Sequence, residues 1–224
     1  MRKLTVILFA LLGVVFFNSC KDETTDEKPQ ATDTGILNEL KGYAGKTYEE
    51  ISVTILSKGF TLTDSNVGEG FGFYTFSNSD ATITYDFFKY ENKMCMMSYS
   101  LYNDNRDVLL SNFEKYSLSA IAFIGNTSSI YEGEIELLDS MEGGEEFENR
   151  TDFLAAYNQN KPNIAYCYED WTTQDYIIGS EFDYAEGDEY ENYSLIGYAD
   201  VSLLPPMFDK SNKSIFEILH KKRR

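Results

Sequence analysis

The stretch FGFYTFSNSDATITYDFFKYENKMCMMSYSLY, residues 71–102, contains three aromatic-rich runs separated by two short polar breaks. The runs cover residues 71–77, 82–90 and 94–102, and their aromatic and β-branched content is typical of strands. The breaks at residues 78–80 and 91–93 are built from Asn, Ser, Asp, Glu and Lys, a composition that favours hairpin turns. The sequence therefore predicts three consecutive antiparallel strands.

A helix is predicted just before this meander. Thr47 and Glu50 have the spacing of a capping box, in which each residue's side chain binds the other's backbone N–H. Apolar residues then recur at helical spacing, at Tyr48, Ile51, Ile55 and Leu56. Gly59 follows, and glycine is the residue most often found just beyond a helix C-terminus.

The second half of the chain shows a comparable pattern. Residues 107–123 predict a helix, although 120–124 would fit a strand equally well, and residues 130–138 predict a strand. The acidic, glycine-containing residues 141–148 are interpreted as a loop. Residues 150–160 predict a short helix that Pro162 stops, followed by strands at 163–171, 176–184 and 193–203. Gly187 and Asp188 mark the last hairpin turn.

These elements predict an α+β fold of antiparallel sheets with helices packed on one face. A helix followed by three strands occurs twice, which suggests tandem units at residues 35–104 and 105–205. The alternative is one α+β domain with a single larger sheet. Residues 206–224 form a tail that ends in HKKRR, interpreted as a solvated terminus or, alternatively, as a segment that pairs with the acidic surface.

The charge balance excludes several classes of function. The chain has 19 basic and 37 acidic residues, a net charge of −18, which argues against nucleic acid as a partner. With one His and three Cys, a zinc cage or a His-based catalytic triad is hard to build. We therefore predict no metal, no cofactor and no catalytic residue.

Residues 1–19 have the features of a secretory signal peptide. Arg2 and Lys3 precede an almost wholly apolar run at residues 4–17, which is too short to span a bilayer stably. The following Phe17-Asn18-Ser19-Cys20 resembles a bacterial lipobox. That resemblance implies cleavage before Cys20, acylation of this cysteine and anchoring in an outer membrane.

The residues after Cys20 carry a second targeting signal. Lys21, Asp22 and Glu23 resemble the export signal of Bacteroidota surface lipoproteins, which implies that the protein faces outward from the cell. Residues 20–34 are polar and read as a flexible tether. Removal of residues 1–19 leaves 17 basic and 37 acidic residues, a net charge of −20.

Candidate functional residues come from the aromatic and acidic side chains. Trp171 with Tyr166, Tyr176 and Tyr184 is predicted to form a binding face on the sheet, because tyrosine offers a rigid ring and a hydroxyl. Carboxylates at residues 145–148 and 186–189 leave a two-acid glycan or peptidoglycan hydrolase as the alternative. Cys95 and Cys167 are interpreted as buried thiols, with a disulfide as the alternative.

Two further resemblances bear on function. Asp139-Ser140-Met141 resembles the acceptor site for O-linked glycans in secreted Bacteroidota proteins, which implies an exposed Ser140. The repeated helix-and-strands layout is similar to that of the beta-lactamase-inhibitory proteins, although no motif carries over residue by residue. Taken together, the sequence predicts a non-catalytic, lipid-anchored surface protein with an acidic, Tyr-rich domain that binds protein, peptide or glycan.

Overall fold

The meander predicted over residues 71–102 is present in the computed structural model, which describes residues 33–138, 143–185 and 192–206. Strands β2 (Phe71–Ser77), β3 (Ile83–Tyr90) and β4 (Lys93–Tyr102) pair in antiparallel order. A fourth strand that the sequence analysis did not predict, β1 (Thr61–Val67), pairs with β2 at the edge of the sheet. Every residue of β1 is exposed, so the strand shows no alternating burial signal.

Two helices precede these strands, α2 (Gly35–Tyr43) and α3 (Tyr48–Ser57), of which only α3 was predicted. The predicted capping box of α3 is confirmed. The backbone N–H of Thr47 donates to Glu50 Oε2 at 2.8 Å, and the backbone N–H of Glu50 donates to Thr47 Oγ1 at 3.4 Å. Gly59 adopts a φ of +88°, the left-handed conformation that favours glycine after a helix.

The second half begins with helix α4 (Arg106–Ile124), so residues 120–124 are helical. Next come β5 (Ile130–Leu137) and the short strand β6 (Glu145–Phe147), which lies where a loop was predicted because it pairs with β5. Helix α5 (Arg150–Asn160) gives way at Pro162 to a 3-10 turn, η1 (Lys161–Asn163). Strands β7 (Ile164–Thr172), β8 (Tyr176–Asp183) and β9 (Tyr193–Asp200) follow, and η2 (Val201–Leu203) is a second 3-10 turn.

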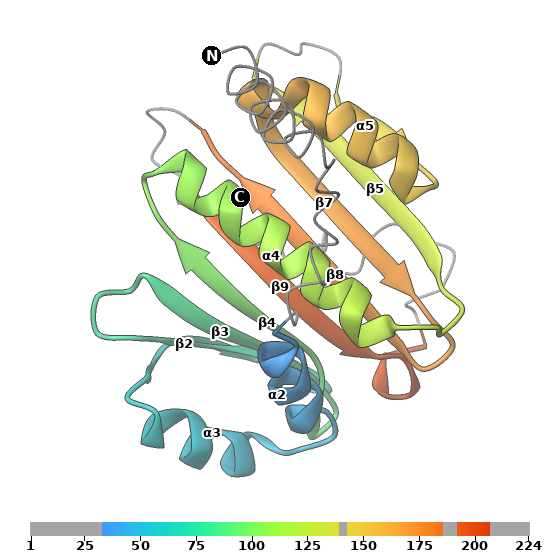
Figure 1. Cartoon of the computed structure of the whole chain (residues 1–224). Coiled ribbons are helices and arrows are strands. Elements are labelled where there is room, and N and C mark those ends of the chain that lie inside the picture. Colours follow the sequence, from blue (N-terminus) through green and yellow to red (C-terminus); the bar gives the residue numbers. More distant parts are fainter. Residues whose placement is uncertain (1–32, 139–142, 186–191, 207–224) are drawn as a thin grey trace, which may run out of the picture. The chain divides into compact units, whose positions relative to one another are not determined.

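The described strands form one nine-stranded antiparallel sheet in the order β1-β2-β3-β4-β9-β8-β7-β5-β6. Strands β4 and β9 join the two halves through a register that runs from Met96 opposite Ala199 to Tyr102 opposite Tyr193. The described helices lie on one side of this sheet (Figure 1). The predicted α+β class is thus confirmed, and the strands of both suggested units belong to a single sheet.

The face of the sheet under the helices, here called the helix face, contains the main hydrophobic core. One cluster packs α2, α3 and the end of α4 against aromatic residues of β2, β3, β8 and β9. Its ring contacts include Tyr48 stacked on Tyr74 at 4.3 Å and Tyr176 stacked on Tyr198 at 5.8 Å. A second cluster packs α4 and α5 on β5, β7 and β8, around the fully buried Phe153 and Phe182.

The opposite face of the sheet has a smaller apolar cluster at one end. Phe88, Met96, Ile177 and Ala199 are buried there, and the turn η2 with Leu204 packs against them. The chain therefore reaches Pro206 on this side of the sheet. Within the described residues, no helix combines the length and the apolar character needed to span a bilayer.

Several sequence predictions concern residues outside those that the structure describes. They are the signal peptide, the lipidation and export residues Cys20, Lys21, Asp22 and Glu23, most of the tether, Ser140, the acidic residues 186–189 with the hairpin at Gly187, and the tail from residue 207. All of these stay predictions.

Candidate functional site

Carboxylates and tyrosines gather on the opposite face of β5, β7, β8 and β9. Successive strand residues point to alternate faces, so the pairing register identifies the side chains that share this face. Asp170 lies opposite Gly179 on β8, and Glu181 lies opposite both Tyr168 and Leu195. We call the resulting group the acidic patch; it consists of Glu134, Tyr166, Tyr168, Asp170, Glu181, Asp183 and Tyr193.

The four strands that carry the acidic patch, β5, β7, β8 and β9, contain no Lys or Arg. Asp170 and Glu181 are nevertheless buried, with 4% and 2% of their surface exposed. The Tyr193 hydroxyl donates to Glu181 Oε1 at 2.8 Å. Burial, followed by the charges of Glu181, Asp170 and other nearby carboxylates, raises the pKa of Tyr166, so this phenol stays neutral at physiological pH.

Next to the acidic patch, β3 and β4 add a polar network. Asp86 accepts hydrogen bonds from the hydroxyls of Thr75 at 2.7 Å, Thr84 at 3.3 Å and Ser98 at 3.4 Å. Ser100 lies in the same row as Leu195 and Glu181 and is fully buried. Its Oγ has no hydrogen-bond partner among the residues that the structure describes.

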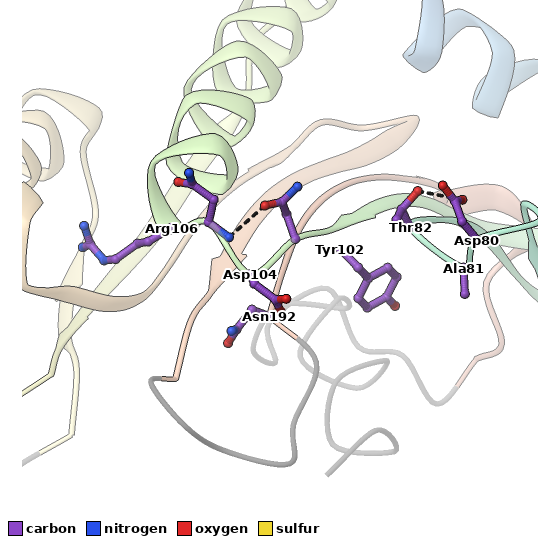
Figure 2. A pocket seen from close by; sticks show the side chains of 9 residues that line it. Asp80, Ala81, Thr82, Tyr102, Asp104, Arg106 and Asn192 are labelled. Carbon is purple, nitrogen blue, oxygen red and sulfur yellow. Dashed lines mark hydrogen bonds between the residues drawn. The ribbon is translucent and has the colours of Figure 1, made fainter.

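A cleft of about 840 Å³ lies at the end of the sheet near the acidic patch. In Figure 2, Tyr102 stands between Asp104 and Asn192 on one side and Asp80 and Thr82 on the other. The Tyr102 ring is 6.0 Å from that of Tyr193, a member of the acidic patch. The guanidinium of the nearby Arg106 points away from the cleft in Figure 2 and donates instead to the carbonyls of residues 161 and 164. The cleft is therefore polar and acidic, with an aromatic ring at its centre.

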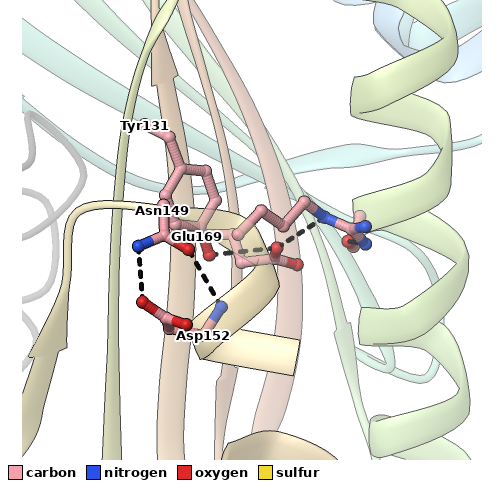
Figure 3. Close-up of polar contacts among 6 residues, drawn as sticks. Tyr131, Asn149, Asp152 and Glu169 are labelled. Atoms are coloured by element: carbon pink, nitrogen blue, oxygen red, sulfur yellow. Dashed lines mark hydrogen bonds and ion pairs between the residues drawn. The ribbon is translucent and has the colours of Figure 1, made fainter. Parts of the chain in front are cut away.

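A different buried carboxylate, Glu169, lies on the helix face. The Tyr131 hydroxyl, seen beside Glu169 in Figure 3, donates to Glu169 Oε1 at 3.2 Å. Arg150 Nε donates to the same oxygen at 3.0 Å. Arg150 also donates to the Ser117 hydroxyl on α4 at 3.0 Å. Burial raises the pKa of Glu169 although Arg150 opposes the shift. This group connects α4, α5 and β7, and with Glu169 only 1% exposed it has a structural role.

The four residues of the predicted binding face do not lie together. Trp171 and Tyr176 are in the core of the helix face, 5% and 9% exposed, and Tyr184 packs against the second core cluster. Tyr166 alone lies in the acidic patch. Strand alternation could have shown the separation, because positions 166 and 171 of one strand fall on opposite faces.

The same alternation could have identified the carboxylates that share the face of Tyr166, namely Asp170 on β7 and Glu181 and Asp183 on β8. Of the predicted carboxylate clusters, Glu145 and Glu146 are exposed on the edge strand β6.

Cys95 and Cys167 are both buried free thiols. Within the described part of the chain, no three His, Cys, Asp or Glu residues are arranged to hold a metal ion.

The chain was also compared with known proteins. No family model matches it, and neither the curated proteins nor the solved structures contain a match.

Proposed function

We propose that this protein is a non-catalytic binding protein, lipid-anchored to the outer membrane through Cys20, whose acidic patch binds positively charged segments of peptides or proteins. The observation that carries the proposal is the concentration of carboxylates and tyrosines on four neighbouring strands that contain no basic residue. Export through Lys21, Asp22 and Glu23 would present this patch outside the cell.

The chemistry of the patch suits Lys and Arg side chains. Ammonium and guanidinium groups form charge-assisted hydrogen bonds to carboxylates such as the half-buried Glu134 and Asp183, and these bonds are stronger than neutral ones. The neighbouring tyrosine rings offer a surface for cation–π contacts. A net charge of −18 also accelerates the encounter with a cationic partner and repels anionic ones.

The central test measures binding of a fluorescein-labelled dodecapeptide of alternating Lys and Ser by fluorescence anisotropy. The variant Glu134→Gln/Asp183→Asn, which changes the two half-buried carboxylates of the patch, should bind this peptide at least tenfold more weakly, because each lost charged hydrogen bond is worth about 1.5–3 kcal/mol. The control variant Glu49→Gln/Asp107→Asn removes the same charges from exposed helix positions and should change affinity little. A matching peptide of Glu and Ser should not bind.

The outcomes separate the proposal from its alternatives. Equal affinities of the patch variant and the control variant for the Lys-Ser peptide would overturn it, provided that circular dichroism shows both variants folded. Binding of a chitin or cellulose oligosaccharide that depends on Tyr102, without binding of the Lys-Ser peptide, would point to a glycan as the ligand instead. Release of sugar from such a substrate, dependent on Asp170 or Glu181, would replace binding with hydrolysis.

The anchor is tested separately from the patch. Cys20→Ser should release the protein from the membrane fraction, because the proposed lipid is attached to that thiol. Neutral residues in place of Lys21, Asp22 and Glu23 should leave lipidation intact but remove the domain from the reach of protease added to whole cells. A Cys20→Ser protein that still fractionates with the outer membrane would contradict the anchor.

A further inference from the structure

The cleft at the end of the sheet has a chemistry that differs from that of the acidic patch. We propose that this cleft binds a neutral, β-linked oligosaccharide, with one sugar ring stacked on Tyr102 and the sugar hydroxyls bonded to the amides and carboxylates around it. The proposal goes beyond cation binding by the patch and does not depend on it. The cleft volume of about 840 Å³ lies within the range of about 300–1,000 Å³ that is usual for ligand pockets.

Three segments of the chain form the walls of the cleft, and backbone hydrogen bonds join them. The segments are the turn between β2 and β3, the connection from β4 to α4, and Asn192 just before β9. The backbone N–H of Tyr102 donates to the carbonyl of Thr82 at 2.8 Å. The backbone N–H of Asn103 donates to the carbonyl of Asn192 at 3.2 Å. The walls are therefore held in place by the fold, which reduces the ordering that a ligand has to impose.

Three asparagines that line the cleft supply hydrogen-bond donors. The side-chain oxygen of Asn103 accepts from the backbone N–H of residue 105 at 2.8 Å. The side-chain oxygen of Asn105 accepts from the N–H of residue 107 at 3.0 Å, and that of Asn192 accepts from the N–H of residue 185 at 2.8 Å. Because the chain itself holds each oxygen, the NH2 group is the end of each amide that can serve a ligand.

Two carboxylates supply acceptors on either side of the aromatic ring. Asp80 and Asp104 are both exposed and both line the cleft, and Figure 2 shows Tyr102 between them. The hydroxyl of Thr82 donates to Asp80 Oδ1 at 3.0 Å, which orients this carboxylate. The ring of Tyr102 thus has acceptors on both sides and amide donors nearby.

This mixture of donors and acceptors selects the class of ligand. An anion would meet the two carboxylates, while the guanidinium of Arg106 donates to backbone carbonyls away from the cleft. A cation would leave the three amide donors without an acceptor. A hydroxyl both donates and accepts, so a neutral molecule with many hydroxyls can use both kinds of group.

The aromatic ring narrows the ligand further. Tyr102 is half-buried and offers a rigid, partly apolar surface at the centre of the cleft. A β-linked pyranose with equatorial substituents has a flat C–H face that fits on such a ring, and its hydroxyls then project sideways. They would point toward the asparagines and aspartates that surround the ring.

Calorimetry with cellotetraose and chitotetraose tests the cleft in the full-length chain. We expect at least one of the two to bind with a Kd of about 1 mM or lower. Tyr102→Ala should weaken that binding at least tenfold because the stacking surface is lost, whereas Tyr102→Phe keeps the ring and should stay within about threefold. Tyr90→Ala is the matched control, because this half-buried tyrosine lies at the other end of β3, and it should leave the affinity unchanged.

The substitution Asn192→Asp tests the donors without changing the size of the side chain. The carboxylate can still accept from the backbone N–H of residue 185, but it has no NH2 group to donate. Sugar binding should weaken about fivefold, which corresponds to the loss of one neutral hydrogen bond. Asn66→Asp adds the same charge on the exposed β1 and should leave sugar binding unchanged.

Failure of the cleft and failure of the acidic patch give different results. If neither tetrasaccharide binds at concentrations up to about 10 mM, the cleft proposal is overturned. Sugar affinities that are equal in wild type, Tyr102→Ala and Asn192→Asp would also overturn it, provided that circular dichroism shows the variants folded. The patch variant Glu134→Gln/Asp183→Asn should bind the sugar as wild type does. Sugar binding that is lost in the patch variant but kept in Tyr102→Ala would place the sugar outside the cleft and contradict the proposal.

Discussion

The ion pair beneath α5 allows a sharp prediction for the substitution Arg150→Ala. Glu169 is 1% exposed and Arg150 29%, so removal of the arginine takes the cationic partner away from a buried carboxylate. Loss of one partner of a buried pair costs about 3–5 kcal/mol. We expect the lower end, about 3 kcal/mol, because Tyr131 still donates to Glu169. The control Lys161→Ala breaks a half-exposed pair with Glu114 and should cost less than about 1 kcal/mol.

The stability loss of Arg150→Ala should depend on pH, and the direction follows from the pKa of Glu169. Burial raises the folded-state pKa of Glu169 above its usual 4.5, and loss of Arg150, which lowers it, raises that pKa further. A carboxyl with a raised folded pKa favours the folded state below its unfolded pKa and loses that contribution as pH rises through the folded value. The loss in free energy of unfolding caused by Arg150→Ala should therefore be larger at pH 8 than at pH 5.

Urea titrations followed by the fluorescence of Trp171, the one tryptophan of the chain, measure these free energies of unfolding. The double variant Arg150→Ala/Glu169→Gln should recover part of the loss at pH 8, because no charge is then left buried. A deficit no larger than that of Lys161→Ala, or one that does not change between pH 5 and pH 8, would refute the reasoning.

Three further predictions follow from burial and capping. Trp171→Ala should lower the free energy of unfolding by about 3–5 kcal/mol in urea titrations, because the ring is 5% exposed in the core; a loss below 1 kcal/mol would place it outside the core. Thr47→Ala should lower the free energy of unfolding by about 0.5–2 kcal/mol, because Thr47 caps a helix. Ser65→Ala, on the exposed β1, should leave that free energy almost unchanged, because Ser65 caps no helix. Iodoacetamide should label Cys95 and Cys167 only after denaturation, because both are buried and burial raises the pKa of Cys95 to about 12; labelling of the native protein, read by mass spectrometry, would contradict this.

Local sequence signals predicted most of the described elements. The helix α5 has the predicted bounds because Pro162 cannot continue a helix, and the capping box located the start of α3. Strand β1 was missed because an exposed edge strand rich in Thr, Asp, Ser and Asn has no buried face to impose alternation. The pairing of β4 with β9 joins residues about 100 positions apart, and no local pattern contains that information.

Local sequence patterns also could not identify the face of the sheet that carries the candidate site. Periodicity along β7 separates Tyr166 and Asp170 from Trp171, but it does not reveal which of the two faces the helices cover. That choice is made by the apolar surfaces of α4 and α5, which pack on Cys167 and Phe182. Tyrosine content alone therefore could not identify a binding face, because Tyr176 and Tyr198 stack in the core while Tyr193 lies among carboxylates.

The buried carboxylates on the two faces of the sheet have different surroundings, and this difference links binding to stability. On the helix face, the buried carboxylate Glu169 has an arginine from α5, so its charge is compensated within the fold. In the acidic patch, Asp170, Glu181 and Asp183 lie on neighbouring strands that contain no Lys or Arg. A Lys or Arg side chain that binds the patch adds an attraction that exists only in the folded state. Occupation of the patch by a cationic partner should thus raise the free energy of unfolding, and this shift would be measurable as a higher urea midpoint in the presence of the Lys-Ser peptide.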